Sequence, residues 1–216
     1  MGNLYKKGKF LVLEGQGFTG KTKQAHLLVE KLKEKGIEVV ETQEPGGVES
    51  AISIREELLK RRAENSITPE EEVELFYKSR EKFLNELVLP NLEQGKWVVS
   101  TRFSASTFVY QGFVDGVSLD LIQKLEDEVV NGNQPDLYIL IDVSEEEIMR
   151  RMKSSDREKH GYNESDLDII KKRREGYLKL TKENINGNWV IVDGNGTIME
   201  VFEEVWGVVK EKFSLK

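Results

Sequence analysis

Residues 15–22 form an octet, GQGFTGKT, that constrains the fold more than any other part of the chain. The octet matches the pattern G-x-x-x-x-G-K-[ST], with an apolar run at residues 10–13 before it and a helix-prone segment at residues 23–35 after it. A strand, a glycine-rich loop and a helix in this order predict backbone N–H groups that converge on phosphate at a helix N-terminus. The alternative is a glycine-rich turn that precedes a helix by chance, and the complete motif with both flanks argues against it.

The last two residues of the octet predict the chemistry of the loop. Lys21 is expected to reach the β- and γ-phosphates of a nucleotide, and the hydroxyl of Thr22 is expected to ligate Mg²⁺. We therefore expect ATP and Mg²⁺ as cofactors, with Thr22 as the metal ligand. The residues expected to bind the nucleotide are Gly15, Gln16, Gly17, Phe18, Thr19, Gly20, Lys21 and Thr22.

Short apolar runs alternate along the chain with charged segments of helical spacing. The apolar runs lie at residues 10–13, 37–40, 97–100, 137–142 and 189–192. The helical segments lie at residues 21–35, 69–88, 119–130, 145–152, 165–184 and 198–213. This alternation predicts an α/β protein, a three-layer P-loop fold with a five-stranded parallel sheet flanked by helices, in a single domain over residues 1–216. Ligands in such a fold bind at the carboxyl ends of the strands.

Composition excludes several classes of function. The net charge is −7, whereas a dedicated nucleic-acid binder carries a basic surface, so we expect no nucleic-acid partner. The chain has no cysteine and only two histidines, which excludes disulfides, thiolate catalysis and a zinc site. No segment approaches the roughly 20 apolar residues that span a bilayer, and the N-terminal run does not read as a signal peptide. We expect a cytoplasmic protein without a membrane partner.

Four segments beyond the octet carry motifs in a characteristic order. Residues 42–47 read TQEPGG, residues 74–80 read ELFYKSR, residues 102–112 read RFSASTFVYQG, and residues 174–178 read REGYL. In order and spacing they resemble the thymidylate kinase family, and the similarity runs over most of the chain. The resemblance implies phosphoryl transfer from ATP to dTMP, with ADP and dTDP as products, by a homodimer.

The resemblance also implies roles for the substrate-binding residues. Phe76 would stack on the thymine ring, and Arg80 would donate hydrogen bonds to a base carbonyl. Arg55 and Arg102 would hold the acceptor phosphate, since a guanidinium binds phosphate bidentately. Arg80 has no acidic partner three or four residues away on its own helix, so it is expected to point at something specific. Further substrate-binding residues would be Glu44, Pro45, Ser106, Thr107, Tyr110 and Gln111.

The resemblance places a lid around residues 150–164 that would close over the phosphates and exclude water. Arg150 would contact the nucleotide, and Arg157 would be catalytic. The catalytic residues expected are Lys21, Arg102, Arg157 and Glu14.

The sequence departs from the family pattern near the phosphates. Gly17 stands where an acidic residue is usual, Phe18 where glycine or arginine is usual, and Thr101 replaces the aspartate of a D-R-Y motif. Gln43 replaces the arginine of T-R-E-P-G-G. Glu14 is then the carboxylate best placed to support Mg²⁺ or its waters. Two alternatives stay open: a kinase for another deoxynucleotide or a deoxynucleoside, and a weakly catalytic nucleotide-binding sensor.

Overall fold

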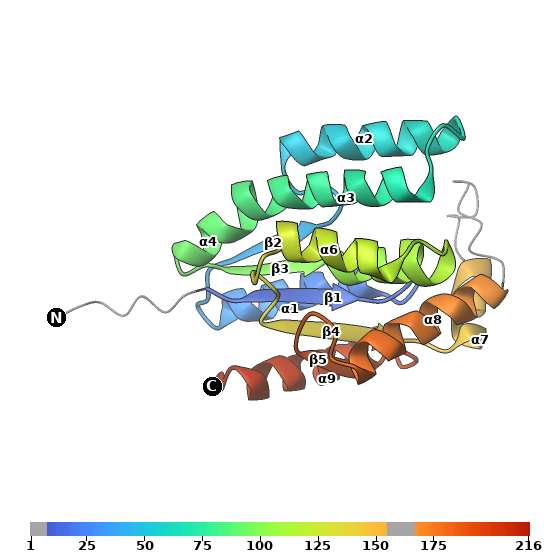
Figure 1. The fold of residues 1–216 in the computed structure, drawn as a ribbon. Helices are drawn as coiled ribbons and strands as arrows, with labels where there is room; N and C mark the ends of the chain where they lie inside the picture. The colour runs from blue at the N-terminus through green and yellow to red at the C-terminus, as the bar shows by residue number, and fades with distance from the viewer. Residues whose placement is uncertain (1–7, 155–166) are drawn as a thin grey trace.

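A computed structural model describes residues 8–154 and 167–216. A parallel β-sheet lies at the centre of the fold (Figure 1). Its strands run in the order β2-β3-β1-β4-β5, and every neighbouring pair is parallel. This arrangement confirms the predicted five-stranded parallel sheet. The strands are β1 (Phe10–Glu14), β2 (Val39–Gln43), β3 (Trp97–Thr101), β4 (Leu137–Asp142) and β5 (Trp189–Asp193).

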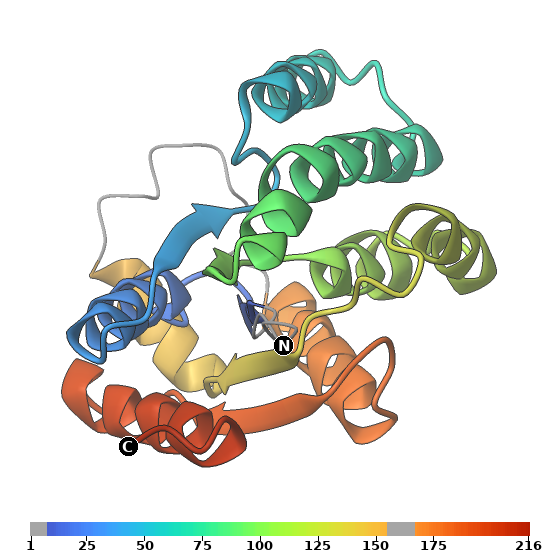
Figure 2. The same ribbon diagram turned by 90° about the vertical axis from the view of Figure 1, so that its left-hand side faces the viewer.

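Helices cover both faces of the sheet (Figure 2). The α-helices are α1 (Lys21–Glu34), α2 (Glu49–Ala63), α3 (Pro69–Phe83), α4 (Leu89–Glu93), α5 (Ser104–Thr107), α6 (Leu119–Val129), α7 (Glu145–Lys153), α8 (Leu167–Lys182) and α9 (Ile198–Lys212). Two π-helical segments, η1 (Leu84–Val88) and η2 (Phe108–Val114), continue α3 and α5. Helices α1 and α9 pack on one face, and α3, α6 and α8 lie on the other. Among the helices of the two described segments, none has the length and apolarity that a membrane crossing requires.

Strand β1 shows how the sheet separates two cores. Its five residues are all buried, because helices cover both faces. Phe10 and Val12 belong to the core beneath α3, α6 and α8, whereas Leu11 and Leu13 belong to the core beneath α1 and α9. Successive side chains of a strand point to opposite faces, so one apolar run supplies both cores. Glu14 ends the run at the carboxyl edge of the sheet.

Strand β2 and helix α2 differ from the prediction, and the short helices α4 and α5 were not predicted either. Strand β2 begins at Val39, two residues later than the apolar run at 37–40, and its ladder with β3 extends to Gln43 opposite Thr101. β2 lies at an edge of the sheet, where its polar side chains reach solvent. Helix α2 was not predicted, because only Ala51 and Leu58 of its residues are buried and it carries no clear apolar stripe.

The packing predicts unequal costs for two leucine truncations. Leu28 of α1 is fully buried in the core shared with α9, whereas Leu59 of α2 is 45% exposed. Leu28→Ala should lower the free energy of unfolding by about 2–5 kcal/mol, since it removes buried methyl groups and leaves a cavity. Leu59→Ala, the matched control, should change it by less than about 0.5 kcal/mol. Urea unfolding followed by circular dichroism measures both, and equal costs would contradict the assignment of the core.

Candidate active site at the carboxyl edge of the sheet

The predicted phosphate loop lies between β1 and α1. Lys21 Nζ donates to the carbonyl of Gln16 at 2.8 Å, and Thr19 Oγ1 donates to the same carbonyl at 3.1 Å. Gly15 has a φ of 139°, and a Cβ there would lie 2.9 Å from the carbonyl oxygen of Ile141, so the position requires glycine. Thr22 is exposed at the start of α1. The loop therefore places an ammonium, a hydroxyl and a helix N-terminus together.

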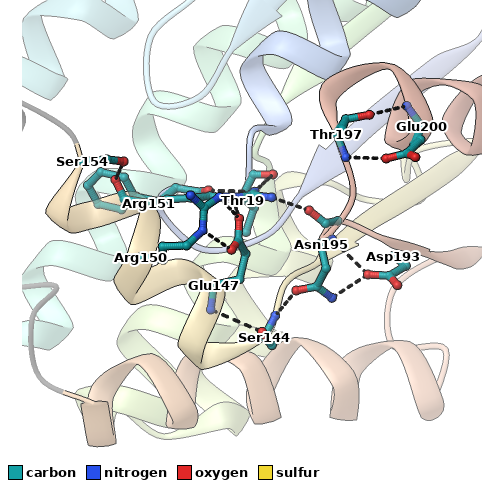
Figure 3. A network of polar contacts seen from close by, with 12 residues as sticks. Thr19, Ser144, Glu147, Arg150, Arg151, Ser154, Asp193, Asn195, Thr197 and Glu200 are labelled. Atoms are coloured by element: carbon teal, nitrogen blue, oxygen red, sulfur yellow. Dashed lines mark hydrogen bonds and ion pairs between the residues drawn. The ribbon is translucent and has the colours of Figure 1, made fainter.

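Arg151 of α7 donates hydrogen bonds to this loop and to the segment after β5 (Figure 3). Its Nη1 donates to the carbonyls of Phe18 and Thr19 at 3.2 and 3.3 Å, and its Nη2 donates to the carbonyl of Gly194 at 2.7 Å. Its Nε donates to Glu147 at 2.6 Å. Phe18 has a φ of 62°, a left-handed conformation that is unfavourable for a bulky side chain. Arg151, which falls at the start of the range expected for the lid, thus stabilises a strained loop and joins it to the segment after β5.

Arg150 differs from its neighbour in being exposed. It donates to Glu147 through Nε at 2.6 Å and through Nη2 at 2.7 Å. The hydrogen bonds from Arg150 and Arg151 lower the pKa of Glu147 to about 2. Arg150 can therefore move toward a ligand at little cost, because an exposed ion pair contributes little stability.

A pocket of about 480 Å³ opens beside the phosphate loop. Its wall comes from the loop, from α7 and from the segment between β5 and α9. Two hydrogen bonds order this last segment: Asn195 Oδ1 accepts from the backbone N–H of Ser144 at 3.0 Å, and Gln24 Nε2 donates to the carbonyl of Ile198 at 2.9 Å. The volume suits a small molecule such as a nucleobase with its sugar. Residues lining the pocket include Phe18, Thr19, Gly20, Lys23, Gln24, Glu147, Arg150, Arg151, Asn195 and Ile198.

Glu14 is fully buried at the end of β1 and accepts hydrogen bonds from three protein donors. Its Oε1 accepts from the backbone N–H of Phe103 at 2.8 Å. Its Oε2 accepts from Ser106 Oγ at 2.8 Å and from the hydroxyl of Tyr177 at 3.1 Å. The carboxylate therefore joins β1 to the segment after β3 and to α8. The support of Mg²⁺ by Glu14 stays a prediction, and Tyr177, which the sequence did not single out as a site residue, contributes one of the three donors.

Arg102 lies next to this carboxylate with an unusual backbone conformation. Its φ is 69°, and sparsely populated conformations of this kind occur at functional sites. Its Nη1 donates to Ser106 Oγ at 3.1 Å, and its Nη2 donates to the hydroxyl of Tyr110 at 3.2 Å. The guanidinium carbon lies 5.0 Å from the centre of the Tyr110 ring. The structure thus brings together Arg102, Ser106 and Tyr110, which the sequence predicted as site residues.

Arg80 is buried in α3 and pairs with Glu44, a residue distant in sequence. Its Nε lies 2.9 Å from Glu44 Oε1, and its Nη2 donates to Thr107 Oγ1 at 3.0 Å. Its Nη1 is buried and has no hydrogen-bond partner among the described residues. Burial raises the pKa of Glu44 to about 7, and the nearby charge of Arg80 opposes this shift. The pattern on α3 was therefore correct in showing no acidic partner on that helix, and the carboxylate comes from the loop after β2.

A second polar pair lies nearer the start of α3, in its first turn. Gln111 Nε2 donates to Glu72 Oε2 at 3.0 Å, and the other oxygen of Glu72 contacts Arg62 Nε. The guanidinium of Arg62 lies over the ring of Phe76, 5.7 Å from its centre, and Phe76 is half-buried. Neither Glu72 nor Arg62 was predicted as a site residue, since an acidic residue in the first turn of a helix and a basic residue in the last turn are ordinarily favourable charges at the helix ends.

Two of the predicted substrate-binding residues, Arg55 and Pro45, are not part of the networks that the described residues form. Arg55 is exposed on α2, and no contact within the described segments places it against the other site residues. Pro45 is half-buried beside Glu44 and follows a cis peptide bond. Arg157 and most of the lid expected around 150–164 lie outside the described residues, so both stay predictions.

The contacts of Glu14 predict the effect of an isosteric substitution. In Glu14→Gln one accepting oxygen becomes an amide NH₂ that faces an N–H or O–H donor, so the free energy of unfolding should fall by about 1–3 kcal/mol. Glu203→Gln, at an exposed position of α9, is the control and should leave stability unchanged. Thermal and urea unfolding measure both variants. A Glu14→Gln protein as stable as the original would show that the three hydrogen bonds do not hold the site together.

Comparisons with known proteins agree with this geometry. The family model for thymidylate kinase matches residues 13–205. A thymidylate kinase of Thermoanaerobacter sp. (strain X514) is 36% identical over 205 residues, which cover 95% of this chain and 98% of the relative. A thymidylate kinase of Clostridium novyi (strain NT) is 34% identical over 206 residues, which cover 94% and 99%. Together with the phosphate loop and the arginines at the strand ends, these matches show that the chain belongs to the thymidylate kinase family.

Proposed function

We propose that this chain transfers the γ-phosphoryl group of ATP to dTMP and releases ADP and dTDP. The observation that carries the proposal is the buried Nη1 of Arg80, a charged donor without a hydrogen-bond partner among the described residues. Leaving such a donor unpaired is costly, and a ligand that supplies an acceptor removes the cost. The carbonyl oxygen at C4 of thymine is such an acceptor. Membership of the thymidylate kinase family supports the same substrate.

The donor nucleotide occupies the loop and the neighbouring pocket in this proposal. The backbone of residues 15–20 and the ammonium of Lys21 bind the phosphates at the N-terminus of α1. The base and sugar of ATP lie in the pocket between α7 and the segment after β5, within reach of Arg150. Arg151 keeps the loop in shape through the carbonyls of Phe18 and Thr19.

The acceptor occupies the other side of the site. Phe76 stacks on the thymine ring, and Arg80 donates to a base carbonyl. Tyr110 packs against the deoxyribose, and Arg102 binds the phosphate with Ser106 beside it. The remaining residues assigned to this half are Arg55 at the phosphate, Thr107 and Gln111 at the base edge, and Glu44 and Pro45 beside Arg80.

Mg²⁺ is the metal that this arrangement suits. Thr22 is exposed and directly follows Lys21 in the sequence, so its hydroxyl lies beside the expected phosphate site. Mg²⁺ favours hard oxygen ligands, and it usually keeps several waters and binds substrate phosphates. Within residues 8–154 and 167–216 no cluster of three or more acidic or histidine side chains forms a metal site of its own. Thr22 and the triphosphate would therefore hold the ion, and the ion would neutralise charge on the β- and γ-phosphates.

The protein's own contribution to transfer is positioning and charge. Lys21 on the donor side and Arg102 on the acceptor side neutralise the charge that spreads over the transferred group. Glu14 acts through Arg102 and Ser106 by fixing the segment that carries them. A catalytic role for Arg157, a lid around 150–164, a homodimer and a cytoplasmic location stay predictions.

An acceptor panel tests the proposal. Release of ADP is measured in a coupled assay with ATP and Mg²⁺, with dTMP, dUMP, dCMP, dGMP, dAMP and thymidine offered one at a time. We expect the highest kcat/KM with dTMP. Faster turnover of another acceptor would identify a different deoxynucleotide or deoxynucleoside kinase. Binding of ATP without transfer to any acceptor would favour a nucleotide-binding sensor.

Substitution of the loop lysine tests the donor side. Lys21→Ala should lower kcat with dTMP by about two to three orders of magnitude, because it removes a charge that stabilises the transferring phosphoryl group. The KM for dTMP should change little, since Lys21 faces the donor. Lys33→Ala, exposed on the same helix, is the control and should retain full activity. Near-normal kcat in Lys21→Ala would refute the assignment of the phosphate loop.

A further inference from the structure

Helix α3 and the α5–η2 segment form two polar contacts with an aromatic ring between them. Glu72, Phe76 and Arg80 are spaced four residues apart, so they lie along one face of α3. Thr107 and Gln111 are spaced in the same way on the facing segment. Arg80 donates to Thr107 at 3.0 Å at one end, and Gln111 donates to Glu72 at 3.0 Å at the other. Phe76 therefore lies between two hydrogen bonds that join the same two elements.

The second contact determines which end of the Gln111 amide faces Glu72. A carboxylate only accepts hydrogen bonds, so Gln111 must present its NH₂ group to Glu72. The carboxylate is itself held by Arg62, which contacts the oxygen that Gln111 does not use. Glu72 is 5% and Gln111 3% exposed, so water has little access to reverse the amide. The carbonyl oxygen of Gln111 consequently lies on the side away from Glu72.

We propose that Glu72 is a positioning residue that sets base specificity by directing the carbonyl oxygen of Gln111 toward N3 of the bound base. The inference rests on the proposed function, which places the acceptor base on Phe76. Thymine carries an N–H donor at N3 and a carbonyl at C4, whereas cytosine carries an acceptor at N3 and an amino group at C4. An acceptor from Gln111 and a donor from Arg80 match thymine at both positions and cytosine at neither.

The orientation of the amide thereby becomes a determinant of selectivity. A site built to hydrogen-bond its substrate discriminates strongly against an analogue that leaves buried polar groups unpaired. If Gln111 turned its NH₂ toward the base, it would oppose the N3–H of thymine and match the N3 acceptor of cytosine. Glu72 and Arg62 together hold the amide in the orientation that thymine needs.

Glu72→Gln tests this directly, because the amide oxygen of a glutamine at position 72 would accept from Arg62 and its NH₂ group would face Gln111. Gln111 would then turn its carbonyl toward position 72 and its NH₂ toward the base, so the ratio of kcat/KM for dTMP to that for dCMP should fall by about tenfold or more. For dTMP the change should appear mainly in KM, with kcat within about twofold. Glu74→Gln, exposed on the same helix, is the matched control and should keep the original ratio.

A reciprocal variant provides an independent test that does not depend on the folding of Glu72→Gln. In E72Q/Q111E the glutamine at 72 donates to the carboxylate at 111, whose second oxygen accepts from N3–H, so the preference for dTMP over dCMP should return. An unchanged dTMP:dCMP ratio in Glu72→Gln, or loss of the preference in the double variant, would overturn the inference. Failure of the unsubstituted protein to phosphorylate dTMP would instead overturn the proposed function, and this inference with it.

Discussion

The site depends on the hydrogen bonds that the buried carboxylate of Glu14 accepts. It ends the central strand and accepts from the backbone of Phe103, from Ser106 and from Tyr177. A buried carboxylate is costly unless donors surround it, so these contacts determine where the segment after β3 and helix α8 can lie. Ser106 contacts both Glu14 and Arg102, and the left-handed backbone of Arg102 persists within this network.

Arginine side chains organise both halves of the site, in different ways. On the donor side Arg151 donates to backbone carbonyls of the phosphate loop and of the segment after β5, so it fixes the shape of the pocket. On the acceptor side Arg80 is held by Glu44 and Thr107, and one of its donors has no partner in the part of the chain that the structure describes. The hydrogen bonds of Arg151 stabilise the protein's own structure, so Arg151 is a positioning group. Arg80 has a donor available for a ligand, so Arg80 is a recognition group.

The fold could be predicted well where local pattern and tertiary environment agree. The octet at residues 15–22 lies between a fully buried strand and a helix, and all five predicted strands are present. Helix α2 was not predicted, because Ala51 and Leu58 are its only buried residues. Its sequence therefore lacks apolar residues spaced every three to four positions. Strand β2 was misplaced by two residues because its ladder with β3, rather than its apolar residues, sets its limits at the edge of the sheet.

The sequence by itself determined the phosphate loop, the parallel sheet and the set of polar residues at the strand ends, because those depend on glycine, on period and on spacing along the chain. Only the tertiary structure decided the partners: Glu44 for Arg80, Glu72 for Gln111, Tyr177 for Glu14 and the loop carbonyls for Arg151. Each of these contacts joins elements far apart in the sequence. Local pattern carries no information about such a contact, since its geometry exists only once the helices have packed on the sheet.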